Sequence, residues 1–154
     1  MIGDAMPCLR QILGLVLLMY VCLGGMPAAL AAAPADAAQP RAVYHLDDSA
    51  RAMAAIRNIN NQMRAAPGTR IVVVALGNGI DFLLKDAKDD RGNPYEPMID
   101  DLIAAGVEFK ACNNTLTTRK IERSRVHPDA GIVESGVAEI TRLQFFEGFA
   151  YVKP

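Results

Sequence analysis

Cys112 is the residue whose type and position indicate the clearest chemistry in this sequence. It ends the predicted strand 107–112 and is followed by Asn113-Asn114-Thr115, side chains that commonly cap helices. The thiol is therefore expected between a strand end and a helix start, where free N–H groups and the helix dipole favour the thiolate. A thiolate is the form that acts as a nucleophile or carries a sulfane sulfur. The alternative is a small buried side chain that only closes the strand.

A second candidate is the turn Gly77-Asn78-Gly79, which follows the β-branched run 71–76. Its backbone N–H groups are suited to an anion, and its glycines let a ligand come close. Phe82 stands where the third glycine of a dinucleotide-binding motif belongs, so that motif is absent. With Asn113 and Asn114, this turn makes up the predicted ligand-binding set around the thiol. The alternative is a tight strand-to-helix turn without a ligand.

Neither a metal site nor a cofactor is predicted. His45 and His127 have no second ligand at metal-binding spacing, and the acidic segment 86–90 does not have the spacing of a calcium loop. We expect His45 to be a partly buried, hydrogen-bonded side chain unless it is a base beside Cys112. The acidic segment is expected to be a solvated loop.

The charge distribution excludes general binding to nucleic acid. The first 40 residues hold one of the 16 basic residues and two of the 17 acidic ones, so the rest of the chain is neutral, with 15 of each. Binding to a phosphate backbone relies on an excess of Lys and Arg.

The N-terminal segment predicts export. Arg10 precedes the uncharged apolar stretch 12–26, and Ala29-Leu30-Ala31 fits a signal-peptidase site. This stretch is shorter than the roughly 18–20 residues that cross a bilayer. We therefore predict a signal peptide over 1–31, a disordered leader over 32–40, and a periplasmic domain over 41–154 with no stable membrane insertion. An uncleaved anchor is the alternative.

Strand-like and helix-like segments alternate through the predicted domain. Strands are expected at 41–46, 71–76, 107–112, 131–134 and 149–152. A helix is expected between the first two strands, with Ala52, Ile56, Ile59 and Met63 as its apolar stripe; others are expected at 80–84, at 97–105, and from Ser135 with the stripe Val137, Ile140, Leu143 and Phe146. This alternation predicts a three-layer α/β/α fold around a mostly parallel five-stranded sheet. In such sheets ligands bind beyond the carboxyl ends of the strands, where both candidate segments fall.

Three segments resemble exported members of the DsrE/DsrF-like family: 72–84, 106–116 and 135–140. The region around Cys112 and the closing residues 148–154 are the most specific parts of the likeness. The resemblance implies a five-stranded parallel sheet in three layers and assembly into trimers or hexamers. The cytoplasmic branch of the family passes persulfide sulfur along a relay through a cysteine near the sheet edge, and Cys112 is the position that matches it.

These observations predict a periplasmic homo-oligomer, a trimer or hexamer, that carries sulfur on Cys112 and exchanges it with a thiol-bearing protein partner. Removal of the signal peptide would take Cys8 and Cys22 with it and leave Cys112 as the single thiol. The alternative is a binding or assembly module without turnover, which holds a small anionic ligand or a partner protein. A hydrolase or a redox enzyme is not predicted, because no convincing Ser/His/Asp set and no C-x-x-C motif occurs.

Overall fold

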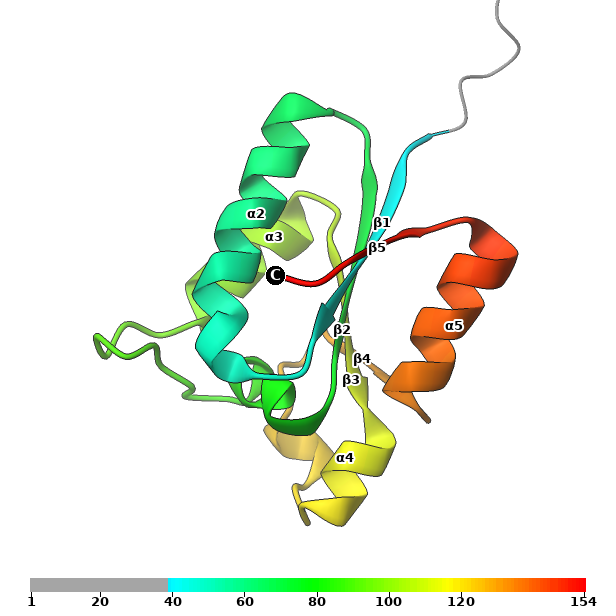
Figure 1. The fold of residues 1–154 in the computed structure, drawn as a ribbon. Helices are drawn as coiled ribbons and strands as arrows, with labels where there is room; N and C mark the ends of the chain where they lie inside the picture. The colour runs from blue at the N-terminus through cyan, green and yellow to red at the C-terminus, as the bar shows by residue number, and fades with distance from the viewer. Residues whose placement is uncertain (1–38) are drawn as a thin grey trace, which may run out of the picture. The chain divides into compact units, whose positions relative to one another are not determined.

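Five parallel strands form one sheet in the order β4-β3-β2-β1-β5 in the computed structural model (Figure 1). The structure describes residues 39–154, so the predicted signal peptide and most of the predicted leader lie outside the described residues. The strands are β1 (Arg41–Leu46), β2 (Arg70–Ala75), β3 (Glu108–Cys112), β4 (Gly131–Val133) and β5 (Ala150–Val152). The predicted parallel sheet is thereby confirmed.

Helices cover both faces of this sheet. Figure 1 shows α2 and α3 on one face and α5 on the other, which gives the predicted three layers. Within residues 39–154, every helix is too short or too polar to cross a membrane. The helices are α2 (Ala52–Ala65), α3 (Glu96–Ala104), α4 (Asn113–Thr118) and α5 (Gly136–Glu147), with the 3-10 segments η1 (Ser49–Arg51), η2 (Gly77–Leu83) and η3 (Arg123–Arg125).

The larger core lies between the sheet and the helices α2 and α3. In β2 every residue from Ile71 to Ala75 is buried, because this strand is covered on both faces, as its continuous apolar run predicts. Ile56 and Ile59 of α2 and Ile99 of α3 pack into the same core. Burial of these aliphatic side chains, at about 1.5–3 kcal/mol each, is the main force that closes this layer.

The core under α5 is smaller and is supplemented by ion pairs. Its buried members are Val43, Val72, Val74, Ile140, Leu143 and Phe149. Glu139 lies 2.7 Å from the Lys110 ammonium, and Arg142 also donates to it at 2.8 Å. The Arg142 guanidinium, followed by Lys110, lowers the pKa of Glu139 to about 2 despite the burial of the carboxylate. The ionised carboxylate therefore helps to hold α5 on β3 at neutral pH.

The apolar stripe predicted for α5 is only half right. Ile140 and Leu143 are buried, but Val137 and Phe146 are 63% and 76% exposed. At 100° per residue around the helix axis, Ile140 and Leu143 lie on the same side of α5 as its first residue, Gly136. Val137 and Phe146 lie about 90° from that direction, one on each side. Phe145 points directly away from the sheet and is 79% exposed. Helix α5 thus presents aromatic surface to the solvent in this single chain.

Gly79 in η2 touches the backbone at the end of β1. A Cβ on this residue would lie 2.1 Å from the Leu46 carbonyl oxygen and 2.8 Å from the Asp47 nitrogen. Both atoms belong to the main chain, so neither can rotate away. The glycine is therefore required by this contact.

We expect Gly79→Ala to destabilise the fold by at least about 2 kcal/mol, because η2 has to leave the end of β1. For a domain of this size that is a fall in Tm of roughly 8 °C or more, measured by thermal unfolding. Gly131→Ala is the matched control, since its new Cβ meets its nearest atom at an ordinary 3.7 Å. Equal Tm values for the two variants would contradict the assignment.

Candidate functional site

The N-termini of two helices meet at the sulfur of Cys112. Cys112 is the last residue of β3 and the N-cap of α4. It pairs with Val133 in β4, and the chain leaves β4 to begin α5 at Gly136. The parallel topology therefore brings both helix starts to the carboxyl end of β3.

Backbone and hydroxyl donors surround this sulfur. The Gly136 N–H donates to Sγ over 3.2 Å. The N–H groups of Thr115 and Asn114 and the Thr115 hydroxyl also lower the pKa of this thiol. Burial raises the pKa of the thiol, but these four donors outweigh burial, so the pKa of Cys112 lies below its usual value. These groups favour the thiolate, while the predicted role of Cys112 in sulfur chemistry stays a prediction.

The sulfur is also covered. Cys112 is 5% exposed, which agrees with the alternative of a buried side chain. Helix α5 comes this close because Gly136 has no side chain: a Cβ there would lie 2.9 Å from Leu76 Cδ2 and 3.2 Å from Cys112 Cβ. The first turn of α5 thus both lowers the pKa of the thiol and covers its sulfur.

The two asparagines after Cys112 make different contacts. The Asn113 side chain accepts a hydrogen bond from Arg123 at 2.7 Å and donates to the Glu134 carboxylate at 3.3 Å. Asn114 is exposed, and its N–H donates to the Glu134 carbonyl oxygen at 3.1 Å. The structure therefore places both residues beside the thiol, where the sequence predicts them, and connects them to the segment that leads into α5.

The turn Gly77-Asn78-Gly79 forms the start of η2, and its two glycine N–H groups have acceptors within the protein. Gly77 donates to Thr115 Oγ1 at 3.0 Å, and Gly79 donates to the Leu76 carbonyl at 2.9 Å. Asn78 is exposed. These bonds are those of a close-packed turn, so ligand binding by Gly77, Asn78 and Gly79 stays a prediction.

His45 does not lie beside Cys112. Its Nδ1 is 2.7 Å from the Tyr151 hydroxyl of β5, and its register partner is Val74 in β2, the strand that separates β1 from β3. Burial, followed by the charge of Lys153, lowers the pKa of His45. The expectation of a partly buried, hydrogen-bonded histidine is confirmed.

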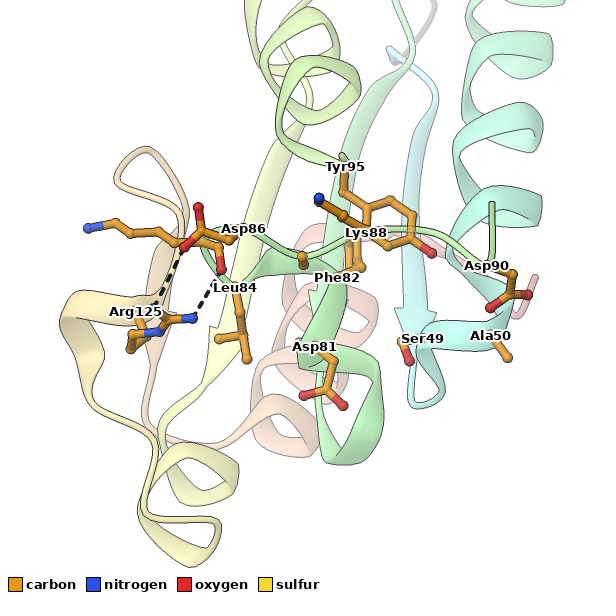
Figure 2. Close-up of a pocket in the computed structure, with 12 residues that line it drawn as sticks. Ser49, Ala50, Asp81, Phe82, Leu84, Asp86, Lys88, Asp90, Tyr95 and Arg125 are labelled. Atoms are coloured by element: carbon orange, nitrogen blue, oxygen red, sulfur yellow. Dashed lines mark hydrogen bonds and ion pairs between the residues drawn. The ribbon is translucent and has the colours of Figure 1, made fainter. Parts of the chain in front are cut away.

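A cavity of about 450 Å³ opens at the same sheet edge, on the side of α2 and α3. Figure 2 shows its lining, in which Arg125 donates to the Lys85 carbonyl at 3.1 Å and lies 3.8 Å from Asp86. Sequence analysis did not predict this cavity, because its lining comes from η1, η2, the segment after η2 and Arg125. Three cationic and three acidic side chains line the cavity, so its charges give no net preference for an anion. The cations are Lys85, Lys88 and Arg125, and the carboxylates are Asp81, Asp86 and Asp90.

The fold and the thiol together place this chain among three-layer α/β proteins with a cysteine at the carboxyl end of a parallel strand, where its surroundings favour the thiolate. The sequence model of the DsrE/DsrF-like family matches residues 28–154, and the chain belongs to this family. A solved structure of a protein of unknown function from Methanobacterium thermoautotrophicum is similar, with 34% identity and a TM-score of 0.66. The match covers 75% of this chain and 99% of that one. Among curated proteins, none is similar enough to count as a match.

Thr115 offers a direct test of the donor set. We expect Thr115→Val to raise the pKa of Cys112, because the Thr115 hydroxyl, which lowers that pKa, is removed. The change also leaves the Gly77 N–H without its acceptor, at a cost of about 1–3 kcal/mol in stability. The measurement is the pH dependence of alkylation at Cys112, read from the mass of its peptide.

Thr115→Ser is the matched control for this variant, since it keeps the hydroxyl and its titration midpoint should stay close to that of the native chain. An unchanged midpoint in Thr115→Val would show that the Thr115 hydroxyl does not stabilise the thiolate.

Proposed function

We propose that the protein is an exported, periplasmic sulfur carrier that holds a sulfane sulfur on Cys112 as a persulfide. The observation that carries the proposal is the set of donors around Sγ, which lowers the pKa of the thiol in spite of burial. Membership of the DsrE/DsrF-like family supports a sulfur role for this position. The N-terminal sequence supports export.

Loading proceeds by attack of the Cys112 thiolate on the outer sulfur of a persulfide donor. A new S–S bond forms on Cys112, and the S–S bond of the donor breaks and leaves the donor as a thiolate. The proton of the donor persulfide stays with the transferred sulfur, so atoms and electrons balance without a cofactor. Unloading repeats the same step, with the thiolate of a partner protein attacking the outer sulfur of Cys112.

Access to the sulfur requires a movement of the first turn of α5. Gly136 covers Sγ, and the Ser135 hydroxyl caps α5 through a long contact of 3.4 Å with the Ala138 N–H. Displacement of this turn removes the Gly136 N–H, the largest favourable contribution to the thiolate, but leaves the Asn114 and Thr115 groups, which belong to α4. The exposed thiol keeps these contributions, and exposure also reduces the burial that raises its pKa.

We expect polysulfide treatment of the full chain to add the mass of one sulfur atom to the peptide that contains Cys112. Cyanide or a small thiol should remove it, because the outer sulfur of a persulfide is transferable. Cys112→Ser should abolish this loading. Cys22→Ser is the matched control and should leave loading at Cys112 unchanged.

Absence of added sulfur at Cys112 in the folded native chain would overturn the carrier proposal. It would favour the alternative, a binding or assembly module, in which Cys112→Ser leaves the cellular phenotype unaltered.

The exposed aromatic surface of α5 supports the proposed homo-oligomer. Phe145 and Phe146 are largely exposed, and their rings meet edge to face with centroids 4.9 Å apart. Tyr151 on the edge strand β5 is 44% exposed. Apolar surface of this kind is more commonly buried against another copy of a chain than left in water.

We expect the native chain to run as a trimer or hexamer, and the double variant Phe145→Asp/Phe146→Asp to dissociate into smaller species. The new carboxylates would have to be buried in the interface without partners. Light scattering after size-exclusion chromatography measures the mass. Gln144→Asp adds charge at an exposed position of the same helix and should keep the native mass; a monomeric native chain would refute the oligomer.

A further inference from the structure

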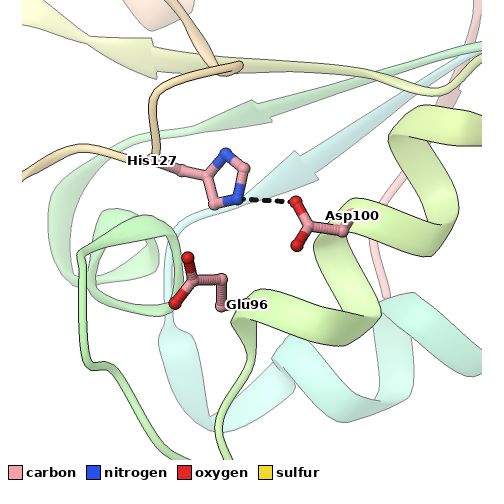
Figure 3. Close-up of side chains that lie close together, drawn as sticks. All are labelled: Glu96, Asp100 and His127. Carbon is pink, nitrogen blue, oxygen red and sulfur yellow. Dashed lines mark ion pairs between the residues drawn. The ribbon is translucent and has the colours of Figure 1, made fainter.

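Three side chains that could bind a metal lie together beside α3. Figure 3 shows Glu96 and Asp100, one turn apart on α3, facing His127 from the segment between η3 and β4. Each of the three offers a ligand atom, and these atoms all lie within 4.8 Å of one another. Residues four apart on a helix share a face, so the two carboxylates point to the same side.

His127 is the buried member of this trio. It is 6% exposed, whereas Glu96 and Asp100 are exposed. Its backbone N–H donates to the Leu83 carbonyl at 2.8 Å, and the Asp129 N–H donates to Nδ1 at 3.3 Å. The ring is thereby held with Nε2 toward the carboxylates.

Nε2 of His127 lacks a hydrogen-bond partner among the described residues. It lies 3.1 Å from Asp100 Oδ1, a distance within ion-pair range, but the two atoms do not have hydrogen-bond geometry. An unpaired polar atom in the interior costs about 1–3 kcal/mol. A nitrogen that is buried, fixed and aimed at two carboxylates without a hydrogen bond is accounted for by a ligand between them.

We propose that Glu96, Asp100 and His127 bind a divalent transition-metal ion, with Zn²⁺ as the test case. One imidazole nitrogen and two carboxylate oxygens are a common donor set for such ions. Two ligands that are each about 2.1 Å from a tetrahedral ion stand about 3.4 Å apart. The 3.1 Å between His127 Nε2 and Asp100 Oδ1 is close to this value, and rotation of the exposed Glu96 side chain completes the set.

The proton on the imidazole ring moves when the ion binds. The contact from the Asp129 N–H makes Nδ1 an acceptor, so Nε2 carries the proton in the metal-free ring. Coordination through Nε2 shifts this proton to Nδ1 and breaks that contact, which at 3.3 Å is the longest one made by the residue.

The bound ion would connect α3 to the segment before β4. Two carboxylate charges and a neutral imidazole match the charge of a divalent ion. Water completes the coordination on the exposed side, where the carboxylates lie. Among the described residues, no hydrogen bond or ion pair joins these three side chains to Cys112, so the site is separate from the sulfur chemistry.

The test is a Zn²⁺ titration of the full chain by calorimetry, together with NMR of the His127 imidazole nitrogens. We expect the native chain to bind one equivalent of Zn²⁺ with a shift of the Nε2 resonance. Asp100→Asn and Glu96→Gln should each weaken this event at least about tenfold, and both exposed variants should keep the native fold. Asp101→Asn, the same change at the next residue of α3, is the matched control and should bind like the native chain.

Zn²⁺ that binds only at cysteines would leave the His127 resonances in place and would overturn the proposal. Equal affinities of the native chain and Asp100→Asn would also overturn it.

Discussion

Two glycines in tight contact with their neighbours set the distance between the helical segments and the ends of the strands. Gly79 holds η2 against the backbone at the end of β1, and Gly136 holds the start of α5 against Leu76 and Cys112. These contacts make the carboxyl edge of the sheet a close-packed junction of main chain. The Gly136 N–H at the start of α5 therefore reaches the Cys112 sulfur, and for the same reason the residue has little exposed surface.

Burial and stabilisation of the thiolate oppose each other at this junction, and the donors decide the balance. An ionised sulfur in an apolar interior is unfavourable, so a buried thiol would normally be neutral. Here three backbone N–H groups and one hydroxyl reverse that preference. Those from Asn114 and Thr115 move with Cys112 because they follow it in the chain, whereas the Gly136 donor moves with α5. The movement of α5 that exposes the sulfur therefore also removes the Gly136 N–H from it.

The sequence predicted those features that depend on local pattern. The continuous apolar run of β2 indicated a strand covered on both faces, and Cys112 was placed at a strand end before a helix, as the structure has it. Features that depend on distant residues could not be predicted. The spacing of apolar residues in α5 does not show which face of this helix packs against the sheet. No sequence spacing connects His127 with the carboxylates of α3. Likewise, the sequence does not show that the Gly77 N–H has an acceptor within the protein, because Thr115 lies in another element.

The two faces of the sheet are stabilised differently, and this difference connects assembly with access to the thiol. The face under α2 and α3 has an extensive apolar core, whereas α5 lies alone on a small core and depends on the Lys110–Glu139 ion pair. A helix with few apolar contacts is the easier one to displace, and α5 is also the helix that covers Cys112. Its outer surface carries Phe145 and Phe146. A second copy packed on these rings would fix α5 in place, so the subunit contact would determine how readily the first turn of α5 uncovers the sulfur.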